Sequence, residues 1–145
     1  MTPDVNVLVA SFRVDHAHHD AARDWLQAAV DAAAGGARFT VFPMVIASFL
    51  RLTTNPRIFP AATPIDAAIA FADAVVAIPG AELGMLGAEW PMLRQLCLDK
   101  QLRANALPDA WLAAAVVHHG EHLATFDAGF RKLLGRGQLT VLKTR

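Results

Sequence analysis

Apolar and polar residues along the chain form two kinds of pattern, short β-branched runs and longer stretches with a helical period. Residues 4–10, DVNVLVA, are rich in valine and predict a short buried strand near the start. Residues 22–33 carry one apolar stripe at helical spacing, which predicts an amphipathic helix that Gly35 and Gly36 end. The stripe consists of Ala22, Trp25, Leu26, Ala29, Val30 and Ala33.

The same patterns continue to the end of the chain. We expect strands near residues 39–42, 75–78, 123–126 and 139–142, and helices near residues 44–54, 65–73, 89–100, 108–120 and 129–134. Thr63 and Pro64 offer an N-cap and an N1 proline to the helix near residue 65, and Pro108 suits a first helical turn. Strands that alternate with helices indicate an α/β fold with a small, mostly parallel sheet flanked by helices.

Composition adds limits to this picture. The chain has 145 residues, of which 54% are hydrophobic and 18% charged, so we expect one folded domain over residues 1–145. The single cysteine, Cys97, excludes an internal disulfide and a multi-cysteine zinc site; we expect it to be buried. The sequence shows no signal peptide, and no apolar run reaches the roughly 18 residues of a membrane span. These features favour a reducing, cytoplasmic setting, and the net charge of zero gives no support for a nucleic-acid partner.

Three aspartates stand at the boundaries of the expected elements. Asp4 lies at the first strand, Asp109 in the first turn of a helix, and Asp127 directly after the strand near 123–126. Carboxylates that converge at the ends of strands are typical ligands of Mg²⁺ or Mn²⁺. This interpretation needs the first strand to end near Asp4, whereas a strand over residues 4–10 would place Asp4 at the wrong end. The structural alternatives are a favourable helix-dipole position for Asp109 and an N-cap for Asp127.

The chain resembles the PIN-domain family of VapC-like toxins. The opening DVNVLVASFRVDHAHHDAARDWL, then FLRLTTNPRIF, ATPIDAAIAF, AEWPMLRQL, NALPDAWLAAAVVHHG and LATFDAGFRKL, follow in the order known from one branch of that family. The resemblance implies a three-layer α/β fold and a ribonuclease that uses Mg²⁺ or Mn²⁺, with Asp4, Asp109 and Asp127 as the catalytic, metal-binding acids. It also implies supporting polar roles for Asn6 and Thr125 beside these acids.

The chain departs from the family pattern at one acid. Family members usually carry a glutamate just before the Phe-Leu-Arg stretch, and the matching residue here is Ser48. No acid occurs between Asp31 and Asp66, so the fourth carboxylate is missing. We hypothesise that Ser48 holds a metal-bound water through its hydroxyl, that the ion binds weakly, and that RNA phosphate completes its ligands.

Further residues have a functional and a structural interpretation. Arg51, Arg103 and Arg131 are candidate phosphate contacts, although each also suits an ordinary charged surface. Trp111 is a candidate for stacking on RNA, whereas Trp25 fits the core. The segment HHGEH, residues 118–122, matches a zinc-protease signature, but Gly120 interrupts the helix that this signature needs. His16, His18 and His19 are more typical of a solvated helix entry than of a metal site.

The sequence thus favours an endoribonuclease toxin of a type II toxin–antitoxin system. By the resemblance, its partners are RNA, a small VapB-like antitoxin and a second copy of the chain. We expect the apolar helical segments 65–71 and 90–98 to form the dimer contact. Two alternatives remain. One is a PIN-like domain that only binds RNA or antitoxin. The other is an unrelated hydrolase with Asp4 as nucleophile, which usually has a second aspartate where Asn6 stands.

Overall fold

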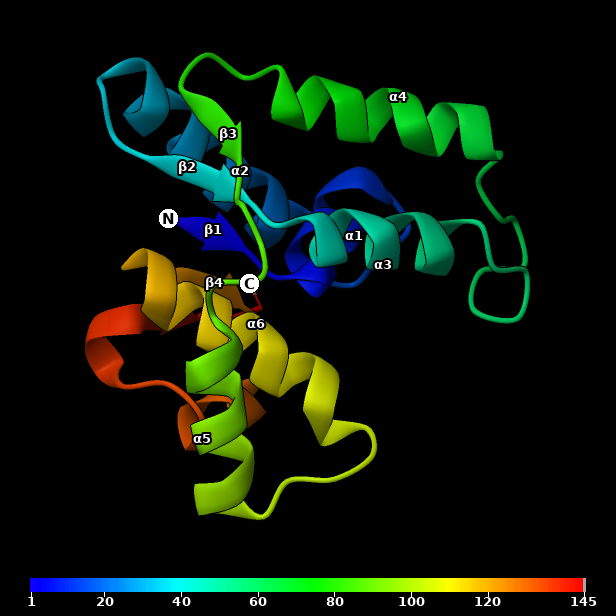
Figure 1. Ribbon diagram of the computed structural model, residues 1–145. Helices are drawn as coiled ribbons and strands as arrows, with labels where there is room; N and C mark the ends of the chain where they lie inside the picture. The colour runs from blue at the N-terminus through cyan, green and yellow to red at the C-terminus, as the bar shows by residue number, and fades with distance from the viewer. Residues whose placement is uncertain (145) are drawn as a thin grey trace.

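Short parallel strands form the centre of the molecule, and helices cover them on both sides (Figure 1). The computed structural model describes residues 1–144. Its strands are β1 (Thr2–Pro3), β2 (Phe39–Val41), β3 (Ala81–Leu83), β4 (Leu123–Thr125) and β5 (Leu139–Val141). Its helices are α1 (Val5–Phe12), α2 (His19–Ala34), α3 (Pro43–Thr53), α4 (Ile65–Val76), α5 (Trp90–Lys100) and α6 (Ala106–His119), followed by the 3₁₀ helices η1 (Ala128–Lys132) and η2 (Arg136–Gln138). The expected α/β fold is confirmed.

The register of the strands brings several carboxyl ends to one edge. Strands β1, β4 and β5 pair in that order, while β2 pairs with β3, and all pairs are parallel. The N–H of Thr40 donates to the carbonyl of Met1 at 3.0 Å, which connects β2 to the start of β1. Pro3 lies opposite Ala124, and Thr125 opposite Val141. Residues that follow β1 and β4 therefore emerge side by side, where ligands of open α/β sheets usually bind.

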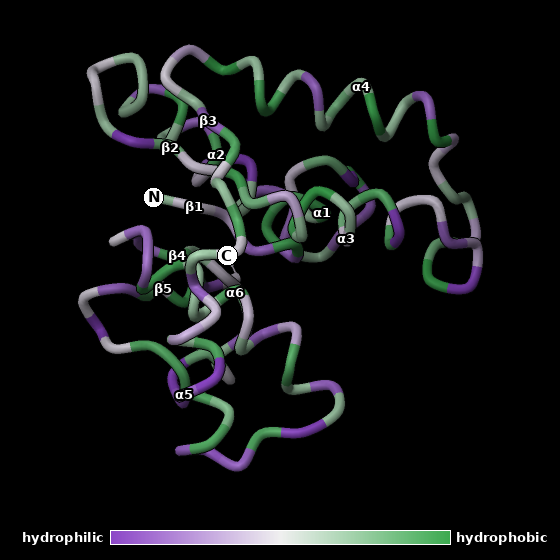
Figure 2. The backbone as a smooth tube through the Cα atoms, in the orientation of Figure 1, coloured by the Kyte–Doolittle hydropathy of each residue, from purple (hydrophilic) through white to green (hydrophobic). Residues whose placement is uncertain are grey.

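The apolar core lies between the strands and the helices around them. Its largest fully buried side chains include Phe39, Phe42, Phe49 and Phe130. Helix α6 contributes small buried residues, mainly alanines, so its backbone can approach the sheet closely. Trp25 packs against both clusters of buried residues, as expected for a core tryptophan. Figure 2 shows that α4 instead alternates between hydrophobic and hydrophilic segments, in line with its largely exposed surface.

The strand expected over residues 4–10 is wrong. Strand β1 ends at Pro3 and helix α1 begins at Val5, with Asp4 as its N-cap. The Asp4 carboxylate accepts a hydrogen bond from the Val5 N–H, which satisfies one donor of the first turn. Val7 and Val9 are buried within this helix. Tertiary burial thus overrides the β propensity of valine here.

Two further expectations fail around α4. The strand expected at 75–78 is absent, because α4 continues to Val76 and buries Val75. Strand β3 begins only at Ala81, after the turn through Gly80, whose φ of 86° suits glycine. Thr63 does not cap α4 either, since Pro64 occupies the N-cap position without a side-chain hydrogen bond. The other expected elements are confirmed within a few residues, the last helix as the 3₁₀ helix η1.

Candidate active site

Asp4 is the most tightly held side chain at the carboxyl edge of the sheet. It follows β1 directly, and its N–H continues the ladder by donating to the carbonyl of Ala124 at 2.9 Å. Only 5% of its surface is exposed. The Val5 N–H donates to Oδ1 at 2.7 Å, and the Asn6 side-chain amide donates to Oδ2 at 2.9 Å. The structure therefore places Asp4 where the metal interpretation requires it.

The hydroxyl of Thr125 connects the ends of β1 and β4. It donates to Oδ2 of Asp4 at 2.6 Å and accepts from the Asn6 amide at 3.0 Å and from the N–H of Asp127 at 3.0 Å. The Asn6 carbonyl oxygen accepts from the N–H of Phe126 at 3.1 Å. Asn6 and Thr125 thus fix Asp4 and the backbone at Asp127. Their supporting roles beside a metal ion stay a prediction.

The three predicted acids lie within electrostatic range of one another. Burial raises the pKa of Asp4 from 3.8 to about 6; hydrogen bonds from Thr125 and Val5 oppose the rise, and the charges of Asp109 and Asp127 add to it. Burial, followed by the charge of Asp127, also raises the pKa of Asp109. Asp127 is exposed and caps η1 by accepting from the Gly129 N–H at 2.7 Å. Carboxylates from three distant segments therefore repel one another at one edge of the sheet.

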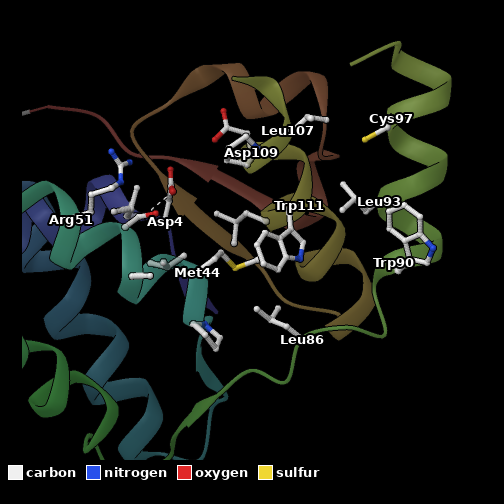
Figure 3. Close-up of a pocket in the computed structure, with 17 residues that line it drawn as sticks. Asp4, Met44, Arg51, Leu86, Trp90, Leu93, Cys97, Leu107, Asp109 and Trp111 are labelled. Carbon is white, nitrogen blue, oxygen red and sulfur yellow. Dashed lines mark hydrogen bonds between the residues drawn. The ribbon is translucent and has the colours of Figure 1, made fainter. Parts of the chain in front are cut away.

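A large cavity of about 1010 Å³ opens beside these acids. Asp4 and Asp109 both line it, together with Ser48 and Arg51 of α3. Figure 3 shows Arg51 and Asp4 at one end, whereas Trp90, Leu93 and Cys97 of α5 lie at the other. Most of the lining is apolar, so a ligand there would meet charged groups mainly at the acidic end. Cys97 lines this cavity and is only partly buried, which corrects its expected full burial.

The candidate RNA contacts divide between different places. Arg51 and Trp111 line the cavity with the acids, whereas Arg103 does not line it and Arg131 lines a separate one. The indole N–H of Trp111 donates to Oε1 of Glu89 at 2.6 Å. That hydrogen bond connects α6 to the start of α5. It gives Trp111 a structural partner as well as a position at the cavity.

Two buried acids had no functional interpretation in the sequence. Glu89, before α5, accepts from Trp111 and from the N–H of Gly87 at 2.8 Å. Glu121, before β4, accepts from the hydroxyl of Thr40 at 2.6 Å and pairs with Arg38 at 3.0 Å. Their side-chain partners Trp111, Thr40 and Arg38 lie 22 or more residues away in sequence, so no local spacing could have revealed them. Glu121 therefore connects the segment before β4 to the start of β2, and the described residues show no zinc site around it.

The histidines also have separate partners. His119 lies 2.7 Å from the carbonyl of Met85, and His122 lies 3.0 Å from the carbonyl of Gly137. His18 stacks on Phe126 with ring centroids 4.5 Å apart. Within residues 1–144, no three histidine, cysteine or acidic side chains stand close enough together to hold a metal ion. A ready-made zinc site is thus absent from the described residues.

The donor set at the acidic edge nevertheless suits a hard cation. Its three acids offer carboxylate oxygens, and burial, with the charges of Asp109 and Asp127, raises the pKa of Asp4. Mg²⁺ and Mn²⁺ prefer oxygen ligands, and Mg²⁺ usually keeps several waters, so it needs few direct protein ligands. Asp4, Asp109 and Asp127 are the residues that would hold such an ion.

Comparison with known proteins identifies the family. The PIN-domain family model matches residues 1–134. The chain belongs to the PIN-domain family. Ribonuclease VapC25 of Mycobacterium tuberculosis is 39% identical over 130 residues, which cover 89% of each chain. Ribonuclease VapC43 of the same organism is 33% identical over 130 residues, covering 89% of this chain and 86% of that protein.

A solved structure supports the fold of this PIN domain independently. The crystal structure of VapBC2 from Rickettsia felis bound to a DNA fragment from their promoter matches with a TM-score of 0.67. The match covers 98% of both chains at 13% sequence identity. At that identity the likeness concerns the fold alone, and it agrees with the parallel sheet and flanking helices seen here.

Proposed function

We propose that this PIN domain is a metal-dependent endoribonuclease toxin of a type II toxin–antitoxin system. The observation that carries the proposal is the buried carboxylate of Asp4, held by Thr125 and Asn6 beside the charges of Asp109 and Asp127. Relatives named VapC ribonucleases, alike over most of their length, support the choice of RNA as substrate. Asp4, Asp109 and Asp127 are the acids assigned to catalysis.

Each residue at the acidic edge has a role in this proposal. Thr125 and Asn6 hold the Asp4 carboxylate in one orientation at the wall of the cavity. Arg51 binds the phosphate that the acids alone would repel, because its guanidinium lines the same cavity. Ser48 stands at that cavity too and can orient a water through its hydroxyl. A bound Mg²⁺ or Mn²⁺ would supply an activated water and offset charge on the attacked phosphate.

The partners follow from the exposed apolar surface and from the relatives. Ile65 and Ile69 of α4 are exposed, and so are Trp90 and Leu98 of α5, as expected for contact surfaces. Figure 1 shows these two helices at opposite ends of the molecule, so they form two separate surfaces. We assign these surfaces to a second copy of the chain and to a VapB-like antitoxin. Within residues 1–144, no helix has the length and hydropathy to cross a membrane.

A second candidate function is binding without catalysis. Ser48 lines the cavity where relatives of this fold usually supply a glutamate, and the described acids do not form a ready-made three-ligand group. With fewer charged ligands, metal affinity falls. On this alternative the domain binds RNA or antitoxin at the same cavity and cleaves neither.

RNA cleavage by the purified protein tests the proposal. Total bacterial RNA is incubated with Mg²⁺, Mn²⁺ or EDTA, and discrete products are expected only with metal. Asp4→Asn and Asp109→Asn should each lower the rate at least about 100-fold, because each removes a charged ligand. Asp73→Asn on the exposed face of α4 is the matched control and should cleave normally. Cleavage that is equal in all variants would reveal a contaminating nuclease, and no cleavage by the folded protein would favour the binding-only alternative.

A further inference from the structure

The neutral net charge of the chain conceals a strong separation of charge. Residues 128–145 contain five basic residues and no acid: Arg131, Lys132, Arg136, Lys143 and Arg145. The first 127 residues contain all 13 acids and only eight of the 13 basic residues, so that part is negative by five charges. The segment that follows Asp127 is thus the basic part of this molecule. An anionic ligand would be attracted to it over several ångströms.

Residues between 131 and 141 of this basic segment line a cavity of their own. The cavity has a volume of about 710 Å³ and is separate from the one that Asp4 and Asp109 line. Arg131 of η1 and Arg136 of η2 line it with Leu134, Gly135, Leu139 and Val141. Leu139 and Val141 share one face of β5, because side chains alternate along a strand. The cavity thus combines two cations with an apolar wall.

Neither arginine of this cavity has a partner among residues 1–144. Two other arginines of the chain, Arg13 and Arg38, form ion pairs. Arg13 binds Asp15 at 2.7 Å, and Arg38 binds Glu121 at 3.0 Å. In the described part of the chain, Arg131 and Arg136 form no hydrogen bond or ion pair, and both are exposed. Two unpaired guanidinium groups at one cavity repel each other, and an anion between them would remove that repulsion.

The topology connects this cavity to the acidic edge. Helix η1 starts directly after Asp127, and the backbone there is held by the Asp127 N–H on Thr125. Val141, which lines the cavity, lies in register with Thr125, whose hydroxyl binds Asp4. Figure 1 shows the orange and red C-terminal segment folded beside β4 and away from α4. The second cavity therefore adjoins β5, the strand that pairs with β4 beside Asp127.

We infer that Arg131 and Arg136 form a second phosphate-binding site for single-stranded RNA, beyond the scissile phosphate. The guanidinium groups bind backbone phosphates, and Leu134, Leu139 and Val141 contact the ribose or base between them. The inference rests on the proposed function in taking RNA as the ligand. It differs in placing part of the RNA outside the cavity of Asp4 and Trp111.

RNA binding without cleavage tests this site. A fluorescein-labelled single-stranded oligoribonucleotide is titrated with protein in EDTA, and anisotropy is measured at several salt concentrations. Arg131→Ala/Arg136→Ala should weaken binding about 10-fold. It should also reduce the slope of log affinity against log salt by about 1.4, since each lost phosphate contact removes about 0.7. Arg131→Lys/Arg136→Lys should keep most of the slope, because lysine retains the charge.

The matched control is Arg23→Ala/Arg57→Ala, which removes two exposed charges that line neither cavity. Equal affinity and slope in the two double-alanine variants, with unchanged melting temperatures, would overturn the second site and leave the cavity to a protein partner or to no ligand. Cleavage kinetics separate this result from the proposed function. A raised KM with unchanged kcat in Arg131→Ala/Arg136→Ala supports both the second phosphate-binding site and the proposed ribonuclease function. Arginine-dependent binding by a wild type that never cleaves supports the site and refutes the nuclease.

Discussion

Asp4 and Glu121 are both buried carboxylates, but they lie at opposite ends of the same strands. Asp4 follows β1 and faces the charges of Asp109 and Asp127, and its pKa is raised to about 6. Glu121 precedes β4. Burial by itself would raise the pKa of Glu121, but the Met1 amine, Thr40 and Arg38 together hold it below its ordinary value. The pKa of a buried carboxyl group is thus raised at the carboxyl end of the strands and lowered at their amino end.

This contrast separates an acid that is compensated within the chain from the acid that we propose to be functional. Glu121 has its compensating charge and its hydrogen bonds within the chain, so its burial contributes to folding. Asp4 has hydrogen bonds but no ion pair among residues 1–144, and the charges that shift its pKa are those of Asp109 and Asp127. Uncompensated buried charge is unfavourable to stability and is characteristic of binding and catalytic sites. The missing cation at Asp4 is what a ligand would provide.

The largest expected effect is a pH dependence of stability that Asp4 causes. Because the folded protein binds a proton at Asp4 with a pKa of about 6 and the unfolded chain with 3.8, the folded state loses stability as pH rises between these values. The full loss is about 3 kcal/mol without metal, of which about 2 kcal/mol falls between pH 4.5 and pH 7. Urea denaturation in EDTA at pH 4.5 and pH 7 measures it, and Mn²⁺ at pH 7 should restore part. Asp4→Asn should lose about 2 kcal/mol less stability than the wild type between pH 4.5 and pH 7. An unchanged difference between the two pH values would refute the assignment.

Removing the charge of Glu121 should give the next largest effect, with the opposite dependence on pH. Glu121→Gln should lower the free energy of unfolding by about 1–3 kcal/mol at pH 7, because charge-assisted hydrogen bonds are lost. The difference from the wild type should shrink as pH falls below 4.5, the ordinary pKa of glutamate. Glu82→Gln, which removes an exposed partner of Arg38, is the control and should change stability little. Equal losses of stability in Glu121→Gln and Glu82→Gln would mean that the buried Glu121 contributes no more to stability than the exposed Glu82 does.

A glutamate in place of Ser48 should make the cavity beside Asp4 more negative, which increases its difference from the compensated site of Glu121. Ser48→Glu should tighten binding of Mn²⁺ about 10-fold, which corresponds to about 1.4 kcal/mol, because one more carboxylate then faces the ion. Isothermal titration calorimetry measures the affinity. Ser48→Gln has nearly the same size without charge and should leave it unchanged. If Ser48→Glu binds Mn²⁺ with the same affinity as the wild type, Ser48 does not occupy the position of the family's glutamate.

The smallest expected effect concerns Glu89, a buried acid with a neutral partner. Trp111→Phe removes the indole N–H that donates to Glu89, and should lower the free energy of unfolding by about 1 kcal/mol. Trp90→Phe is the control, since Trp90 is mostly exposed. Thermal melts compare the two, and anisotropy with labelled RNA reads the role of Trp111 at the cavity. Weaker RNA binding with an unchanged melt would make Trp111 a substrate contact instead.

The elements of the fold were largely predictable, and the failures share one cause. The stripe of α2 and the stop at Gly35 depend on neighbouring residues, so the pattern revealed them. The valines of residues 4–10 favoured a strand, yet they form α1, because Asp4 caps that helix and the core buries it. Only the contact of α1 with the rest of the protein decides between these conformations. Family resemblance, and not propensity, pointed to the correct end of β1.

The sequence by itself determined the alternation of strands and helices and the identity of the three acids at element boundaries. Tertiary structure decided how those acids are used. Parallel pairing brought Asp4 beside Thr125, while it brought Glu121 to Thr40 and Arg38. It also placed Arg131 at a cavity with Arg136 and not beside Asp4. Burial and the charges that surround a carboxylate depend on residues up to 121 positions away, and local sequence carries no record of them.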